Sequence, residues 1–239
     1  MLMKQKLKLP KLPFAALAGV LIFCTPAFSA ASAAQNGQYQ ESFWERADFF
    51  VELTPSFMIN TESKTVSAPN PAFFSLGVGM VYPNDTFFSF EPSFHFFWNY
   101  YLVNNGTVYP AEIENRTATA LSFLFNFPAV FSINPTEKSK LKLSPGAAFL
   151  LRIPLIAGGV NATDSGWYGT VQDDIDNMGR WFYENGRFVF LSFNAAWIFE
   201  HIEKISFGPC VAVYFPLIAN LIEKNANGMI VQVGLRLVF

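Results

Sequence analysis

Large apolar residues recur at every second position in eight segments of the chain. In residues 88–100, six aromatic side chains alternate mostly with serine, glutamate, histidine and asparagine. Successive side chains of a β-strand point to opposite faces, so each segment predicts a strand with one apolar face and one polar or small face. The eight predicted strands cover residues 48–60, 74–82, 88–100, 120–127, 141–153, 189–200, 205–215 and 228–239.

The charged residues of the predicted strands all fall on the faces that lack the large apolar residues. A soluble barrel has the opposite arrangement, because its charges face water and its apolar side chains fill the interior. The pattern therefore favours an all-β fold, a closed antiparallel up-and-down transmembrane β-barrel of about eight strands whose apolar faces contact lipid. The charged strand residues are Asp48, Glu52, Glu91, Lys142, Arg152, Glu200 and Arg236.

The connections between the predicted strands alternate between short and long. This alternation is typical of outer-membrane barrels, which have short periplasmic turns and longer extracellular loops. Prolines inside four predicted strands each remove a backbone donor, so we expect bulges or kinks there. The short turns are 82–85, 134–139 and 201–204; the long loops are 61–71, 103–116, 155–185 and 217–227; the prolines are Pro55, Pro92, Pro145 and Pro209.

Composition and the first residues indicate an exported membrane protein. Charged residues make up 14% of the chain, whereas a typical soluble domain has about 25%. Four lysines, the apolar run 14–23 and a small-residue site at Ala33 predict a cleaved secretory signal peptide over residues 1–33. Acylation at Cys24 is the alternative. We expect a short periplasmic segment over residues 34–47 and the barrel over residues 48–239.

Removal of the predicted signal peptide leaves twelve basic residues against eighteen acidic ones, a net charge of −6. An acidic chain of this kind does not favour nucleic acid as a partner. Only Cys210 then remains, so no intramolecular disulfide is expected.

The charges of the polar faces are expected to meet inside the barrel. An eight-stranded barrel is narrow enough to be filled by its own side chains. Strand closure brings Asp48 or Glu52 within reach of Arg236, and Glu91 within reach of Lys142 or Arg152. An ion-pair plug is the first interpretation; a path for protons or solutes is the second.

The sequence contains few residues or motifs that would support catalysis or cofactor binding. The chain has two histidines, of which His95 is predicted to face the interior and His201 lies in a predicted turn. We find no glycine-rich phosphate loop and no metal-spaced cysteine and histidine cluster. We therefore expect no enzymatic activity, no cofactor and no metal site.

The third long loop contains a helical pattern. Thr170 followed by Asp173 predicts a helix start, and Ile175, Met178 and Phe182 form an apolar stripe that ends near Gly186. The stripe either packs over the barrel mouth, with the acidic residues on a solvated face, or belongs to a recognition surface for a host molecule or a small hydrophobic ligand. The recognition candidates are Trp167, Tyr168, Trp181 and Tyr183. Apolar residues of the last loop are expected to pack with this helix; they are Leu217, Ile218, Leu221 and Ile222.

The signal peptide, the eight strands and the closing residues 233–239 resemble the small outer-membrane barrels of the OmpA, OmpX and OmpW type. The resemblance implies residence in the bacterial outer membrane. It also implies that Val233, Leu235, Leu237 and Phe239 form the signal read by the barrel-assembly machinery. Two functions follow: a structural or surface-interaction barrel with a largely plugged interior, or, as the OmpW-like resemblance implies, a narrow transporter for small hydrophobic molecules.

Overall fold

The computed structural model describes seven parts of the chain, and the predicted signal peptide and most of the segment 34–47 lie outside them. The signal peptide and the boundaries of these two segments therefore stay predictions. Glu200 lies in a described strand, but its side chain lies outside the described part. The described residues are 43–59, 71–84, 86–104, 106–111, 118–202, 205–223 and 227–239.

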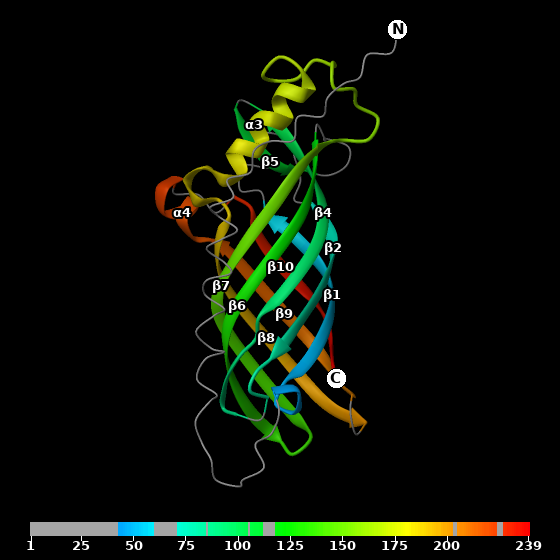
Figure 1. Ribbon diagram of the computed structural model, residues 1–239, viewed down its shortest axis with the longest axis vertical. Helices are drawn as coiled ribbons and strands as arrows, with labels where there is room; N and C mark the ends of the chain where they lie inside the picture. The colour runs from blue at the N-terminus through cyan, green and yellow to red at the C-terminus, as the bar shows by residue number, and fades with distance from the viewer. Residues whose placement is uncertain are drawn as a thin grey trace. The chain divides into compact units, whose positions relative to one another are not determined.

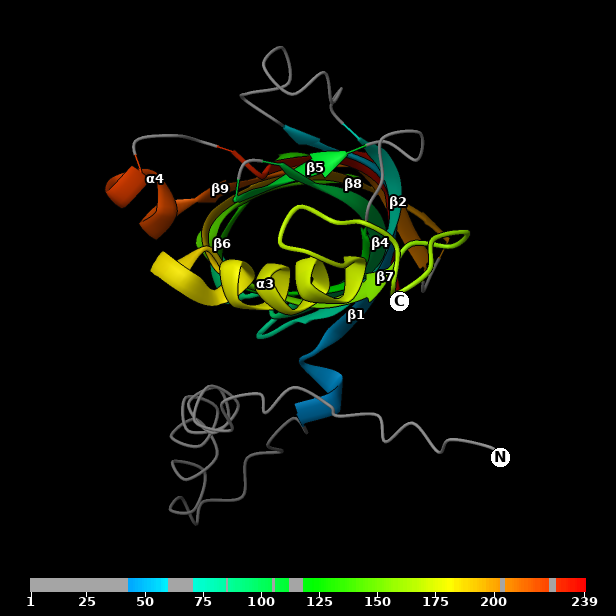
Figure 2. The same cartoon turned by 90° about the horizontal axis from the view of Figure 1, so that it is seen from above.

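The strands form one closed antiparallel barrel (Figures 1 and 2). The first strand pairs with the last one, and β4 pairs with β6, so the described sheet closes on itself. The eight-stranded prediction is confirmed, since β3 and β4 together make the third barrel strand and β5 is a short extension paired with β4. The strands are β1 (Asp48–Ile59), β2 (Ala72–Val81), β3 (Phe88–Phe90), β4 (Ser93–Asn104), β5 (Thr107–Ala111), β6 (Ala118–Thr136), β7 (Ser139–Ile156), β8 (Val189–Ile202), β9 (Ile205–Pro216) and β10 (Met229–Val238).

The predicted alternation of faces is also confirmed. In β1, Phe50, Glu52 and Thr54 are buried inside the barrel, whereas Leu53 and Phe57 are 56% and 46% exposed on the outside. The outer wall is consequently a continuous apolar surface. Other exposed apolar residues of the wall include Phe74, Leu76, Phe96, Trp98, Phe193, Trp197, Val233 and Leu235.

The strand prolines disturb the barrel less than expected. Pro92 interrupts the third strand between β3 and β4, but the pairing register runs unshifted past Pro55, Pro145 and Pro209. The expectation of a bulge at these three residues was wrong. In an antiparallel sheet a residue bonds to one neighbouring strand only, so a proline breaks the ladder on one side while the other side holds the register.

Two helices lie at one end of the barrel (Figure 1). The predicted helix of the third long loop is confirmed as α3 (Val171–Tyr183), which continues into the 3-10 turn η3 (Glu184–Gly186). The last long loop forms a second helix, α4 (Leu217–Glu223), where a loop was expected. Within the described residues, neither helix has the length and apolar character needed to cross a membrane.

The opposite end holds the start and the end of the barrel. Phe239 and Phe49 exchange two backbone hydrogen bonds, of 2.8 and 3.3 Å, so the last residue closes the ladder with β1. A 3-10 turn, η1 (Phe43–Glu45), precedes β1. The Trp44 ring lies 6.0 Å from the outward-facing Phe49 ring, which places η1 against the outer wall.

Candidate functional site in the barrel interior and at its mouth

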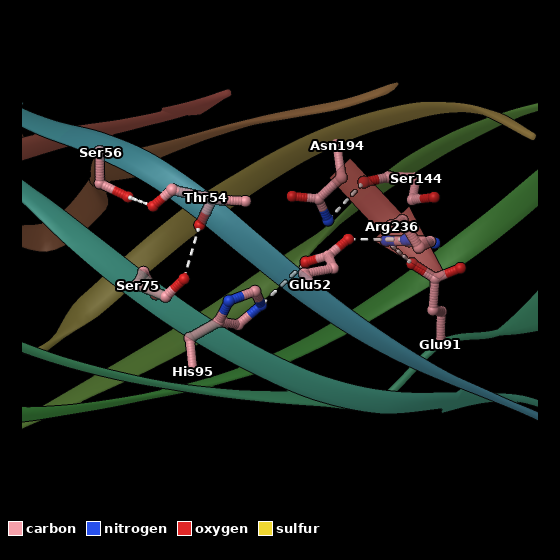
Figure 3. A network of polar contacts seen from close by, with 9 residues as sticks. All are labelled: Glu52, Thr54, Ser56, Ser75, Glu91, His95, Ser144, Asn194 and Arg236. Atoms are coloured by element: carbon pink, nitrogen blue, oxygen red, sulfur yellow. Dashed lines mark hydrogen bonds and ion pairs between the residues drawn. The ribbon is translucent and has the colours of Figure 1, made fainter. Parts of the chain in front are cut away.

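Four charged side chains form a cluster in the barrel interior. Arg236 Nε lies 2.6 Å from Glu52 Oε1, and Arg236 Nη2 lies 2.7 Å from Glu91 Oε1 (Figure 3). Lys142 Nζ lies 4.0 Å from the second oxygen of Glu91. All four side chains are at least nine-tenths buried. Two carboxylates and two cations balance one another, as a buried cluster of charges requires.

His95 and a layer of small polar residues extend this cluster. His95 Nε2 lies 3.6 Å from Glu52 Oε2, and its ring fills the space left by Gly77, where a Cβ would lie 2.6 Å from the ring. Hydroxyl and amide groups follow along the barrel; Thr54 Oγ1 donates to the Ser75 carbonyl oxygen at 3.3 Å (Figure 3). The cavity beside these groups has a volume of about 10 Å³, enough for about one water molecule.

The structure brings together four of the six predicted interior charges. Asp48 accepts a hydrogen bond of 3.0 Å from Asn84 Nδ2 instead of meeting Arg236. Arg152 does not reach Glu91, because it lies ten residues beyond Lys142 on β7, about 33 Å further along the strand. The pairing of Glu91 with Lys142 thus excludes its pairing with Arg152.

The sequence suggested an interior of small and polar side chains throughout, but the structure also has apolar side chains there. Apolar clusters lie on both sides of the charged layer. One is at the end where the chain closes, and there the Arg236 guanidinium carbon lies 4.1 Å from the centre of the Phe50 ring. The other fills the opposite half and includes Met58, Phe97, Tyr101, Leu124, Leu150, Phe190, Tyr214 and Ile230.

Helix α3 completes the second apolar cluster. Its stripe of Ile175, Met178 and Phe182 is buried, and the Phe182 ring lies 4.9 Å from the Tyr101 ring. Seen down the barrel, α3 runs across one side of the mouth (Figure 2). The structure therefore has the arrangement in which the apolar stripe packs over the barrel mouth.

The predicted helix start is confirmed as a capping box. The Asp173 backbone N–H donates to Thr170 Oγ1 at 3.2 Å, and the Thr170 backbone N–H donates to Asp173 Oδ2 at 2.9 Å. Hydrogen bonds from the hydroxyl and backbone N–H of Thr170 lower the pKa of the Asp173 carboxyl below its usual value. This end of the helix is exposed to solvent.

Asp174 was expected on the solvated face of the helix, and this expectation was wrong. Its side chain is buried and accepts hydrogen bonds from the backbone N–H groups of Trp167 and Tyr168, at 2.9 and 2.8 Å. The loop before α3 folds back over the helix and covers this carboxylate. Asp174 thus fixes the loop to the helix.

The four aromatic recognition candidates do not form one surface. Trp167 and Tyr168 are exposed before the start of α3, whereas Trp181 and Tyr183 lie at its other end, about 20 Å away along the helix. The Tyr183 hydroxyl accepts from the Arg152 backbone N–H at 3.0 Å and donates to the Arg152 carbonyl at 2.8 Å. Tyr183 therefore joins the end of α3 to β7 through two hydrogen bonds.

Helix α4 does not pack against α3 as expected for the last loop. Ile218 contacts the position of Gly186, whereas Leu221 and Ile222 are 70% and 56% exposed. Gly186 has a positive φ of 64° and no side chain, which lets Ile218 approach η3 closely.

Arg187 also contacts Trp181, and the hydrophobic pattern of the sequence did not single it out. It follows η3, its guanidinium carbon lies 4.1 Å from the centre of the Trp181 ring, and its Nη1 donates to the Trp181 carbonyl at 2.9 Å. A basic residue just after a predicted helix was an available signal, because it complements the helix carboxyl end. Within the described part of the chain, no group of three or more potential metal ligands was found.

No protein-family model matches the chain, and no curated protein matches it in sequence. Among solved structures, the chain is similar to Neisserial surface protein A (NspA), with 6% identity, a TM-score of 0.50, and coverage of 80% of this chain and 95% of that chain. Ail, the attachment invasion locus protein of Yersinia pestis, has 8% identity, a TM-score of 0.45, and coverage of 81% and 97%. The N-terminal barrel domain of Pseudomonas aeruginosa OprF has 7% identity, a TM-score of 0.39, and coverage of 81% of this chain and 98% of that chain. The likeness to NspA agrees with the predicted fold class.

Proposed function

We propose that this chain is a bacterial outer-membrane protein with a closed barrel and a structural or surface-interaction role carried by its loops. The observation that carries the proposal is the division of side chains across the barrel wall. Large apolar groups cover the outside, and the charged cluster lies within the barrel. Similarity in fold to a Neisserial surface protein supports the same compartment.

The outer face supports contact with lipid. Residues such as Phe74 and Leu235 are 71% and 61% exposed, within a wall of neighbouring apolar side chains. We expect Phe94→Arg on the outer face to destabilise the barrel by about 2–4 kcal/mol if this residue lies at mid-bilayer, and Phe199→Arg near the strand end by about 0–1 kcal/mol. Unfolding of both variants from lipid vesicles measures the difference, and equal tolerance would contradict a lipid-facing wall.

The interior supports a closed barrel. Three layers follow one another along its length: an apolar cluster around Phe50, the charges around Arg236, and the apolar cluster completed by α3. Solute crossing the barrel would have to separate ion pairs that lie 2.6 and 2.7 Å apart. Breaking a buried pair typically costs about 3–5 kcal/mol.

Conductance across planar bilayers tests closure. We expect no channel current from the full chain or from a variant with Met178→Ser and Phe182→Ser, because the charged layer remains. The variant Glu52→Ala with Arg236→Ala leaves both apolar clusters and Glu91 beside Lys142, so we expect it to conduct no ions either. Stable channels in the unmodified protein would reject the closed barrel.

A transporter for small hydrophobic molecules is the second candidate. The observation that favours it is a pocket of about 350 Å³ at the mouth, lined partly by aromatic residues. Uptake of an uncharged aromatic solute into vesicles distinguishes the two: uptake without ion conductance supports transport, and its absence supports the closed barrel.

We further propose that the outward face of β10 and the last residue are recognised by the barrel-assembly machinery. Val233, Leu235, Leu237 and Phe239 are 44–61% exposed on the outer wall. Phe239→Ala is expected to reduce assembly in cells while refolding in detergent proceeds. Equal loss in both settings would assign Phe239 a purely structural role.

A further inference from the structure

Helix α4 leaves most of its large apolar side chains uncovered at the rim of the barrel. They span an arc of about 140° around the helix, at about 100° per residue; they are Leu217, Ile218, Leu221 and Ile222. Ile218 packs against Gly186 of η3. The other three side chains are exposed, by 36%, 70% and 56% in chain order. Helix α4 therefore presents an apolar face that the described residues do not cover.

The apolar face of α4 continues the outer wall of the barrel. Alternate side chains of β9 point outward, among them Val211, which is 41% exposed, and the half-buried Val213 and Phe215. Leu217 is the next residue in this outward series and the first residue of α4. The helix thus begins on the outside of the wall and not in the barrel interior.

The position of α4 agrees with a place at the membrane. Seen down the barrel, α4 lies outside the ring of strands, whereas α3 runs across the mouth (Figure 2). Helix α4 packs against β8 and η3. Ile153 and Leu155 of β7 are each 43% exposed, so the apolar wall extends to the end of the barrel that carries α4 (Figure 1).

We infer that α4 is an interfacial anchor whose exposed residues Leu217, Leu221 and Ile222 contact lipid acyl chains. The inference rests on the proposed membrane barrel and goes beyond it, because it gives part of the last long loop a task at the membrane. Amphipathic helices lie in the interface with the apolar face about 5–10 Å deep, at the boundary of headgroups and acyl chains. Lipid is favoured over a second copy of the chain, because the face of α4 continues a wall built to contact lipid.

Quenching of a bimane fluorophore on single cysteines tests the contact in phosphatidylcholine nanodiscs. The label is attached through Leu221→Cys on α4, Phe193→Cys on the barrel wall or Asp176→Cys on the exposed face of α3. Each variant also carries Cys24→Ser and Cys210→Ser, so that one site is labelled. We expect brominated acyl chains to quench the labels on α4 and on the wall, and aqueous iodide to quench the label on α3.

The two quenchers separate failure of the anchor from failure of the membrane barrel. Lipid quenching on the wall together with iodide quenching on α4 overturns the anchor and leaves the barrel in the membrane. Iodide quenching at both positions rejects the lipid-facing wall as well. Protection of the α4 label from both quenchers means that protein, such as a second copy, covers the helix, and this result also overturns the anchor.

A charge on the apolar face of α4 should withdraw the helix from lipid. With the label attached through Ile222→Cys, we expect Leu221→Asp to remove most of the lipid quenching, because interfacial binding scales with the buried apolar area. Gln172→Asp on the exposed face of α3 adds the same charge away from α4 and is the matched control. Lipid quenching that persists in Leu221→Asp, or an equal loss in both variants, overturns the inference.

Discussion

The charged layer and the mouth of this barrel are built from different kinds of contact. The charged layer is built by side chains of the strands and the β3–β4 junction, with Arg236 between Glu52 and Glu91. At the mouth, a helix from a loop places Met178 and Phe182 among strand residues. One set of contacts therefore belongs to the barrel itself, and the other belongs to a segment that folds back onto it.

The difference has a consequence for stability. Groups in the charged layer join β1, β10 and β7, so their loss affects the whole barrel. Local elements can open without global unfolding, and loops that cover a rigid scaffold commonly do so. We expect changes in the layer to alter barrel unfolding and changes in α3 to alter opening of the mouth.

The largest effect is expected from Arg236→Ala. It leaves Glu52 without its 2.6 Å partner and removes the 2.7 Å contact of Glu91. Leaving buried charges unpaired costs about 3–5 kcal/mol. Urea unfolding in detergent and heat-dependent gel mobility measure the loss. Arg180→Ala on the exposed face of α3 is the control, and equal stability of both variants would contradict a role of the cluster in stabilising the barrel.

The charged layer, which is built by strand side chains, could largely be predicted from the sequence. Alternation fixes which face each residue occupies, so the interior positions of Glu52 and Arg236 follow from their own neighbours in the chain. The pairing with Glu91 could not be chosen from the pattern alone, because Lys142 and Arg152 share a face of β7 and only the register distinguishes them.

The arrangement of α3 and the loop before it at the barrel mouth was less predictable from the sequence. The capping residues Thr170 and Asp173 and the apolar stripe identify α3 locally. The burial of Asp174 depends on how residues 165–169 fold back, and the mouth pocket depends on where α4 lies. Local periodicity does not contain these tertiary contacts.

Met178→Ala is expected to open the mouth without unfolding the barrel. Met178 is fully buried in the α3 stripe, and truncation of a buried methionine costs about 2–5 kcal/mol. We expect the lower end of this range because the loop can relax into the space. Hydrogen exchange of α3 amides should accelerate while urea unfolding of the barrel stays nearly unchanged. Parallel loss of both would mean that mouth and barrel form one cooperative unit.

Asp174→Ala is expected to release the loop before α3. It removes the acceptor of two backbone N–H groups, those of Trp167 and Tyr168. Loss of a buried hydrogen-bond partner costs about 1–3 kcal/mol. Limited proteolysis near Trp167 should become faster, whereas Asp176→Ala on the exposed face of the helix should leave the rate unchanged. Equal rates in both variants would show that Asp174 does not hold the loop.

The smallest effect is expected at the start of α3 and depends on pH. Hydrogen bonds from Thr170 lower the pKa of Asp173, so the ionised carboxylate stabilises the capped helix above the ordinary aspartate pKa of about 3.9. This stabilisation is lost as the pH falls through the lowered pKa of the folded state. Exchange of the first α3 amides, corrected for intrinsic rates, should therefore accelerate relative to the helix centre below about pH 4. Thr170→Val removes the hydroxyl donor and should reduce this pH dependence; an unchanged profile would contradict a role of the Thr170 hydroxyl in it.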